Sequence, residues 1–261
     1  SDKPYVVMCG CNIIFNIDLA EIIDAPERSG AHATMVYCRA EREHDEDVTA
    51  LEIGEAGRVH ALHAGCSFGD NKFLDCCVIN RDVLLQIIDN YRDVDHLDLF
   101  EAIEPEFGRI DVCSYEFKGL ALGVFDEQSY YQRSMEMLRP DLNDRLFNPD
   151  RPIMTKAHDA PPAKYCTGST VCNSLVSAGC LIQGTIRGSI LARDVIVERG
   201  ASVSNSIIMQ SCVIHSGARV ENAIVDKNNV IPAQTELRGT PDATLIIPKA
   251  PLATKELATL D

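Results

Sequence analysis

Four successive rows of 17 residues read Cys180-LIQGTIRGSILARDV-Ile196, Val197-ERGASVSNSIIMQSC-Val213, Ile214-HSGARVENAIVDKNN-Val230 and Ile231-PAQTELRGTPDATLI-Ile247. The columns of these rows are chemically uniform. They comprise Ile186, Val203, Val220 and Leu237; Leu191, Ile208 and Val225; Val197, Ile214 and Ile231; and Ile190, Ile207 and Ile224, with the small residues Ser189, Ser206 and Ala223 beside the last column. An antiparallel sandwich with simple alternation would not hold this register over four rows.

The repeat predicts a left-handed parallel β-helix of hexapeptide-type coils, from about Cys172 to Ile247. Aliphatic residues stand about six apart with small residues between them, which is typical of short strands that meet at the corners of a triangular coil. One coil cannot bury its aliphatic columns alone, so the stack supplies the core and the terminal coils need covers. The open edges of stacked parallel strands favour docking of another chain or domain.

The first half of the chain alternates between apolar runs and helix-like stretches, as an α/β domain does. We expect strands at Tyr5–Cys9, Ala33–Cys38, Arg58–Leu62, Phe73–Ile79 and Ile110–Phe117, and helices at Asp18–Arg28, Arg81–Tyr91 and Glu127–Leu138. Prolines gather between residues 139 and 165 and indicate an interdomain connection. The expected division is therefore an α/β domain at 1–138, a connection at 139–165 and a β-helix domain at 166–261. The acidic run 41–47 is expected to be a solvated loop.

The composition limits the kinds of partner. The 261 residues carry a formal net charge of -15, with a pI near 4.8 and no basic run, which argues against nucleic acid. No apolar run approaches the roughly 20 residues of a membrane helix and the first residues form no signal peptide, so we expect a cytoplasmic protein that does not bind membranes. Eleven scattered cysteines indicate reduced structural thiols, because the close pair Cys9-Gly-Cys11 lacks the further ligands of a zinc site.

Several stretches from Tyr130 onward are similar to one known family. They are Tyr130-Tyr131 with Met135 to Leu138, Phe147-Asn-Pro-Asp-Arg-Pro-Ile-Met-Thr-Lys156, Pro161-Pro-Ala-Lys-Tyr165, Asn205-Ser-Ile-Ile-Met-Gln210 and Glu221-Asn-Ala-Ile-Val-Asp-Lys227. With the order of domains, they resemble bacterial glucose-1-phosphate adenylyltransferase (ADP-glucose pyrophosphorylase). The resemblance implies a partial nucleotidyltransferase-like, Rossmann-like first domain. These residues begin at a strand that the family places mid-domain, and they hold no counterpart of its glycine-rich nucleotide loop.

The resemblance also locates positions that are functional in the family. Where the family has its first metal aspartate, after a strand and a glycine, this chain has Cys11, and a neutral thiol is a poor ligand for Mg²⁺. Gly65 stands where the lysine of a Glu-Lys-Pro motif holds the sugar phosphate. The catalytic machinery that the family uses is therefore altered at both positions.

Two further family positions lie later in the domain. The family's Asp-Phe-Gly-x-Asp motif corresponds to Asp98-Leu-Phe-Glu-Ala102, which keeps the first aspartate as a candidate substrate contact and has Ala102 in place of the second. An ungapped alignment places Gly123 at the last aspartate, whereas a shifted alignment uses Asp126. Taken together, these replacements indicate a degenerate active site.

Within the family, this pattern is similar to the D-type regulatory subunit. The resemblance implies a non-catalytic chain with no cofactor of its own, in a hetero- or homo-oligomer with a catalytic subunit. That partner would hold Mg²⁺ and make ADP-glucose and diphosphate from ATP and glucose 1-phosphate for glycogen biosynthesis. Lys249 lies where the family has a C-terminal lysine that binds phosphorylated effectors, although a solvated lysine on a terminal coil is the simpler interpretation.

Three other functions stay open. An active sugar-phosphate nucleotidyltransferase would need Asp18, Asp98 or Asp126 to replace the missing metal ligands. A hexapeptide-type acyltransferase would use His215 as its base, although no inserted loop interrupts the rows to shape a coenzyme A groove. A purely structural assembly module would bind the catalytic partner without changing its kinetics.

Overall fold

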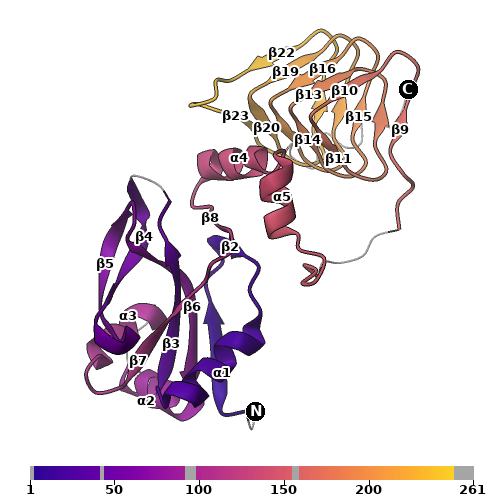
Figure 1. The fold of residues 1–261 in the computed structure, drawn as a ribbon. Coiled ribbons are helices and arrows are strands. Elements are labelled where there is room, and N and C mark those ends of the chain that lie inside the picture. The colour runs from indigo at the N-terminus through magenta and orange to yellow at the C-terminus, as the bar shows by residue number, and fades with distance from the viewer. Residues whose placement is uncertain (1–2, 42–43, 92–97, 155–158, 250–261) are drawn as a thin grey trace. The chain divides into compact units, whose positions relative to one another are not determined.

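The structure is a computed structural model that describes residues 3–41, 44–91, 98–154 and 159–249 (Figure 1). It divides into two compact units. The first consists of Ser1–Phe125 and Arg145–Ile153, and the second of Asp126–Asp144 and Met154–Asp261. The expected fold class, an α/β domain followed by a hexapeptide-type parallel β-helix, is confirmed. The division differs from the one expected from the sequence, because residues 126–138 cluster with the β-helix.

Unit 1 is a mixed α/β fold. Its strands are β1 (Tyr5–Cys9), β2 (Ile13–Phe15), β3 (Ala33–Arg39), β4 (His44–Ile53), β5 (Val59–Ser67), β6 (Asn71–Asn80), β7 (Val112–Glu116) and β8 (Ala121–Gly123). Its helices are α1 (Leu19–Ser29), α2 (Arg81–Asn90) and α3 (Leu99–Ile103), with short 3₁₀ turns η1 (Glu55–Gly57) and η2 (Glu104–Glu106). The main sheet has the order β5-β4-β6-β3-β7, with β1 paired to β6, and β2 pairs separately with β8.

Strand β6 is the centre of the unit 1 core, because both of its faces are buried. Phe73, Cys77 and Ile79 contribute to one apolar cluster, which residues of α2 and α3 complete. Leu74, Cys76 and Val78 contribute to a second cluster on the opposite face, which Ile22 of α1 completes. This alternation explains why the run from Phe73 to Ile79 is almost continuously apolar, since both faces of a covered strand avoid water.

One expectation about an irregular segment is wrong. The acidic run was expected to be a loop, but β4 begins at His44 and pairs there with Ser67 of β5, while residues 42–43 lie outside the described part of the chain. Within the run, His44 and Asp45 pair with Ser67 and Cys66 of β5. The connection at 139–165 contains helix α5 (Pro140–Leu146), whose first residue is a proline, and proline is well tolerated at a helix start because no N–H is needed there.

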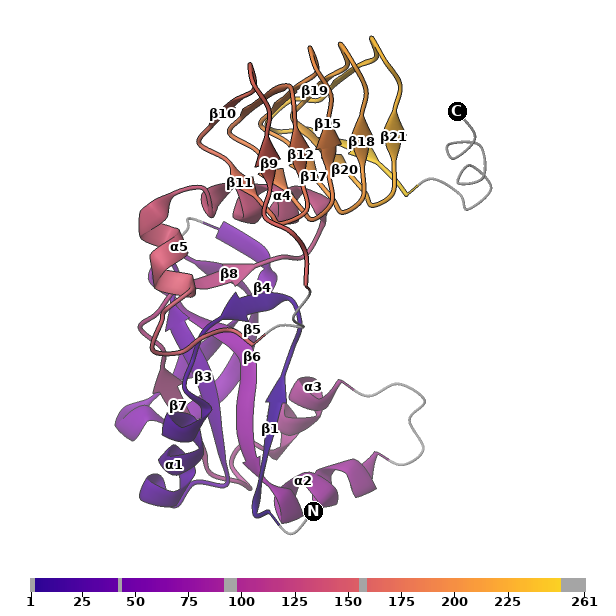
Figure 2. The same cartoon turned by 90° about the vertical axis from the view of Figure 1, so that its right-hand side faces the viewer.

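Unit 2 contains the predicted β-helix, whose coils form three parallel sheets (Figures 1 and 2). One sheet consists of β10 (Thr170–Cys172), β13 (Thr185–Arg187), β16 (Ser202–Ser204), β19 (Arg219–Glu221) and β22 (Glu236–Arg238). The second consists of β11 (Leu175–Val176), β14 (Ile190–Leu191), β17 (Ile207–Ile208), β20 (Ala223–Val225) and β23 (Leu245–Ile247), and the third of β9 (Lys164–Tyr165), β12 (Leu181–Ile182), β15 (Ile196–Val197), β18 (Val213–Ile214) and β21 (Val230–Ile231).

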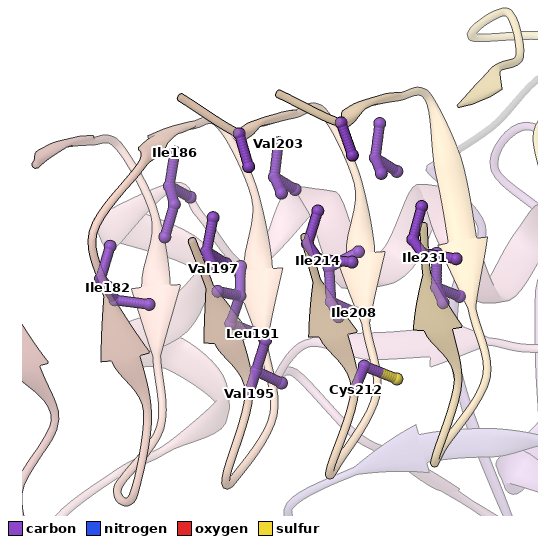
Figure 3. Packing of buried hydrophobic residues seen from close by; sticks show 14 of the residues in the cluster. Ile182, Ile186, Leu191, Val195, Val197, Val203, Ile208, Cys212, Ile214 and Ile231 are labelled. Carbon is purple, nitrogen blue, oxygen red and sulfur yellow. The ribbon is translucent and has the colours of Figure 1, made fainter. Parts of the chain in front are cut away.

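The 17-residue register of the sequence is the pairing register of the coils. Ile186 pairs with Val203, which pairs with Val220, which pairs in turn with Leu237. Three of the predicted columns point inward and form one continuous buried core (Figure 3). Asn205 and Asn222, one coil apart, turn corners at φ 45 and 48, a left-handed conformation that asparagine tolerates better than most residues.

The column of small residues forms a buried ladder of hydrogen bonds. The Ser206 N–H donates to the Ser189 hydroxyl oxygen over 3.1 Å, and the Ala223 N–H donates to the Ser206 hydroxyl oxygen over 3.1 Å. Each serine hydroxyl donates in turn to a backbone carbonyl two residues earlier. These hydroxyls therefore satisfy backbone N–H groups that would otherwise be buried without a partner.

The fourth aliphatic column points outward and is partly covered by helix α4 (Glu127–Glu136). Tyr131 of α4 packs against Ile207 and Ile224, and its hydroxyl donates to the Asn205 carbonyl over 2.7 Å. The Gln128 amide also donates to the Pro241 carbonyl over 2.8 Å. These contacts explain why α4 belongs to unit 2.

Candidate functional site

The loop that joins β1 to β2 forms the first part of the candidate site. The Gly10 N–H donates to the Asp75 carbonyl over 2.7 Å, and a Cβ on Gly10 would lie 2.8 Å from the Asp75 Cβ, so this approach requires glycine. Cys11 is exposed, and its thiol donates to the Asn12 side-chain oxygen over 3.6 Å. The Asn12 carbonyl accepts from the Val124 N–H over 2.7 Å, which ties the loop to the end of β8.

Gly123 lies beside this loop, because it is buried in β8 and pairs with Ile13 of β2. A Cβ on Gly123 would clash with the ring of Phe125. The Phe125 side chain itself packs against a buried cluster made of Ala40, Val48, Ala50 and Cys66. Position 123 therefore has no room for a larger side chain unless Phe125 leaves its place.

Gly65 lies in β5 at an irregularity of the β4–β5 ladder. Its neighbours Ala64 and Cys66 pair with Thr49 and Asp45, so the partner strand bulges opposite Gly65. The backbone of Gly65 has a φ of 81, in the left-handed region that strains residues with a Cβ. A lysine at this position would require a different local backbone.

The two remaining positions expected from the resemblance, Asp98 and Ala102, lie at the start of helix α3 and within it. Asp98 is its N-cap and accepts hydrogen bonds from the Phe100 N–H at 2.8 Å and the Glu101 N–H at 3.3 Å. Ala102, one helical turn later, is 2% exposed and belongs to the apolar core around β6. Asp98 thus caps the start of the helix, and Ala102 packs the helix against the core.

Asp75 is a site residue that the sequence interpretation missed. Burial and then the carboxylate of Asp98 raise the pKa of Asp75, while Lys72 opposes the shift. Asp75 also has a φ of 47, which few residues with a Cβ adopt. The signal in the sequence is an aspartate in the middle of the apolar run from Phe73 to Ile79.

These residues do not fit the carboxylate set that Mg²⁺ needs in the family. The structure brings Cys11, Asp75 and Gly123 to one end of β1, and Asp98 is close enough to influence Asp75. Within the described ranges, no group of three or more His, Cys, Asp or Glu side chains is arranged to hold a metal ion. A thiol, a glycine and a buried alanine supply none of the hard oxygen ligands that Mg²⁺ prefers.

The aspartates that were considered as replacement ligands each cap a helix. Asp18 accepts from the Ala20 N–H over 2.8 Å at the start of α1. Asp126 accepts from the Ser129 N–H over 2.6 Å, and the Ser129 hydroxyl completes a capping box at the start of α4. The hydrogen bonds from Ser129 lower the pKa of Asp126. Like Asp98, both carboxylates therefore have a structural role in helix initiation.

Two candidate residues lie on the β-helix. His215 is half-exposed, and its Nδ1 lies 3.0 Å from the Glu198 carboxylate. The hydrogen bond from His215 lowers the pKa of Glu198. Lys249 is exposed and follows β23, and the Pro248 carbonyl just before it accepts from the Asn229 amide over 2.9 Å. The backbone beside Lys249 is therefore anchored to the last coils.

The outer face of one β-helix sheet is hollowed. A groove of about 320 Å³ is lined by Gly200, Ser202, Ser204, Arg219, Val220, Glu221, Glu236, Leu237 and Arg238. The Arg238 guanidinium lies 2.6 Å from the Glu221 carboxylate. In the part of the chain that the structure describes, Glu198 pairs with His215 and Glu221 pairs with Arg238.

Comparison with known proteins gives the family context. A family model described as "GlmU-like, C-terminal hexapeptide" matches residues 161–242. The chain is 39% identical over 182 residues to "Glycogen biosynthesis protein GlgD" of Bacillus subtilis, a match that covers 70% of this chain and 53% of that protein. The resemblance to the glucose-1-phosphate adenylyltransferase family is confirmed. The chain is also 28% identical over 258 residues to "Glucose-1-phosphate adenylyltransferase" of Cutibacterium acnes, covering 87% of this chain and 62% of that protein.

A second protein named GlgD, from Geobacillus stearothermophilus, is 34% identical over 130 residues, covering 50% of this chain and 38% of that protein. The chain thus spans about half the length of the curated GlgD and adenylyltransferase relatives that it matches. Among the described residues, no helix is both long and apolar enough to cross a membrane.

Proposed function

We propose that this chain is part of a non-catalytic subunit that regulates a catalytic glucose-1-phosphate adenylyltransferase in the cytoplasmic synthesis of glycogen. The similarity to proteins named GlgD supports the pathway. The observation that carries the non-catalytic role is the packing of Ala102 in the apolar core, where the resemblance leads us to expect the second aspartate of the Asp-Phe-Gly-x-Asp motif. A carboxylate at that depth would lack the solvation and the partners that it needs.

The other altered positions support the same proposal. The reaction of ATP with glucose 1-phosphate builds charge on phosphate oxygens, which Mg²⁺ and cationic side chains stabilise in enzymes of this chemistry. Cys11, Gly65 and Gly123 provide neither a hard oxygen ligand nor a cation. We therefore place Mg²⁺ and the chemical step in the catalytic partner, and no cofactor in this chain.

The β-helix is the proposed contact and response surface. Among the described residues, the terminal strands of its sheets pair on one side only, and such edges favour association with another chain in a hetero- or homo-oligomer. Lys249 projects from anchored backbone at the last coil and can pair with a phosphorylated effector as a point charge.

Reconstitution tests the regulatory role. The full-length protein is mixed with the catalytic subunit, and the kcat of ADP-glucose formation and its response to phosphorylated sugars are measured with and without it. We expect the mixture to differ from the catalytic subunit alone in kcat or effector response. We expect Lys249→Glu to weaken the effector response, whereas Lys227→Glu, at another exposed coil lysine, leaves it unchanged. Binding of the two chains with identical kinetics would instead identify a structural module.

A catalytically active nucleotidyltransferase is the second candidate, and the proximity of Asp75 and Asp98 favours it. Two carboxylates can hold Mg²⁺ together with substrate phosphates. In that case Asp75→Asn would abolish ADP-glucose formation by the full-length protein alone. The acyltransferase alternative requires acetyl-coenzyme A turnover that disappears in His215→Ala, and the Glu198 contact shows only that this histidine has a carboxylate neighbour.

A further inference from the structure

Cys9 and Cys76 face each other across two antiparallel strands. Cys9 is the last residue of β1, and the register pairs it directly with Cys76 of β6. The next pair, Gly10 with Asp75, is joined by the Gly10 N–H and the Asp75 carbonyl. Hydrogen-bonded and non-hydrogen-bonded pairs alternate in such a ladder, so Cys9 and Cys76 form a non-hydrogen-bonded pair, in which side chains stand closest.

The two sulfur atoms are close enough to bond after a small movement. They lie 3.2 Å apart, against about 2.0 Å in a disulfide. Cα atoms of a non-hydrogen-bonded pair are about 4.5 Å apart, which falls at the short end of the range that disulfides span. The geometry of the pair is therefore compatible with a disulfide that closes by rotation of the side chains.

The two thiols differ in access. Cys9 is exposed at the end of its strand, whereas Cys76 is 0% exposed. The hydrogen bond with Cys76 lowers the pKa of Cys9 to about 7 despite partial burial, and the same hydrogen bond together with burial holds the pKa of Cys76 far above its usual range. An incoming reagent therefore meets the Cys9 thiolate first, and the Cys9 sulfur lies within reach of Cys76.

We infer that Cys9 and Cys76 form a reversible modification site for small-molecule disulfides of the glutathione class. The Cys9 thiolate attacks the small disulfide, forming a mixed disulfide and releasing one small thiolate. Cys76 then loses its proton and attacks the Cys9 sulfur, which forms the Cys9–Cys76 bond and releases the second small thiolate. Two electrons pass from the protein dithiol to the small disulfide, which is reduced to two thiols, and an excess of small thiol reverses the exchange.

The position of the pair gives the modification a consequence. The new bond would join the end of β1 to β6 directly beside the Gly10–Asp75 hydrogen bond, and so would fix the loop that carries Cys11. The inference stands on the geometry of unit 1 alone, so it is independent of the regulatory role proposed above.

The test is oxidation of the full chain by oxidised glutathione, followed by intact mass and peptide mapping. All variants include Cys77→Ser, so that a crosslinked peptide identifies Cys76 without ambiguity. In this background we expect loss of two hydrogens and one peptide linked through Cys9 and Cys76. Cys11→Ser, the matched control at the neighbouring exposed thiol, should form the same link, and dithiothreitol should remove it.

The variants of the pair separate the two steps. Cys76→Ser should stop at one glutathione on Cys9, and Cys9→Ser, a change at an exposed side chain, should form no link to Cys76. The inference is overturned by a Cys9–Cys11 link, by a stable glutathione adduct on Cys9 while Cys76 is present, or by disulfide-linked dimers in place of the internal bond. It is also overturned if Cys9 does not react.

Discussion

Replacement of Ala102 by aspartate tests whether the core of unit 1 can accept a carboxylate at this position. Ala102 is 2% exposed, and its cluster consists of apolar side chains that include Met35, Phe73 and Val112. A carboxyl group at this position loses its solvation by water in either protonation state. A buried polar group without a partner lowers the free energy of unfolding by about 1–3 kcal/mol, according to mutational measurements. Burial also raises the pKa of the new carboxyl group in the folded state.

The charge contribution depends on pH. Suppose that burial raises the pKa of the introduced carboxyl group from about 4 in the unfolded state to about 7 in the folded state. The free energy of unfolding then falls by about 4 kcal/mol at pH 8 and by about 1.5 kcal/mol at pH 5. The sign follows from the raised pKa, because the folded state holds a proton that the unfolded state has released. Stability is therefore lost as pH rises from about 4 to about 7. Ala102→Asn is the matched control, since it adds a polar group of the same size without the charge.

The assay is hydrogen exchange with mass spectrometry, read separately in the two units. Peptides of β6 report opening of unit 1, and peptides of β17 in unit 2 serve as an internal reference. We expect Ala102→Asp and Ala102→Asn to differ by about 4 kcal/mol in opening free energy at pH 8 and by much less at pH 5. Equal stabilities at pH 8 would refute the reasoning, because the carboxylate would then have found water or a partner.

Three further predictions follow from single contacts. Asp98→Ala should destabilise unit 1 by about 1 kcal/mol in urea unfolding followed by circular dichroism, whereas Asp98→Asn should cost much less; equal losses would show that charge, not capping, matters. Tyr131→Phe removes the hydrogen bond to the Asn205 carbonyl, so it should lower the opening free energy of α4 by about 1 kcal/mol and speed its hydrogen exchange. Unchanged exchange in α4 would contradict a stabilising role for this bond. Alkylation of Cys9 by iodoacetamide should rise with pH around a midpoint of about 7, and Cys76→Ala should move the midpoint upward; a midpoint that does not move argues against the thiol contact.

The β-helix was predictable from the sequence because each coil repeats the environment of the one before it. Ile186 and Val203 occupy the same place in successive coils, so the same column is aliphatic in every row. The hydroxyl ladder was not predictable, because Ser189 and Ser206 differ from other small residues only through the N–H groups that they face. The covering of Ile207 by α4 was also hidden, since it depends on a helix far away in sequence.

The sequence predicted candidate-site positions only where this chain has a different residue from the one that the family resemblance leads us to expect. Cys11 and Ala102 stood out because the resemblance supplies the expected residue at each position, but the sequence could not tell that Ala102 is core packing. The roles of Asp75 and of the Cys9–Cys76 pair require the antiparallel pairing of β1 with β6, which joins residues 67 positions apart. Local patterns contain no information about such long-range pairing.

The most direct test of the non-catalytic proposal is a single-turnover measurement on the full-length protein alone. The protein is placed in excess over labelled ATP, with glucose 1-phosphate and Mg²⁺, and ADP-glucose is measured over hours. Excess protein reveals even slow chemistry, because every ATP molecule can be bound. We predict no ADP-glucose above a control without protein. Formation of ADP-glucose that disappears in Asp75→Asn would contradict the account and would identify an active nucleotidyltransferase.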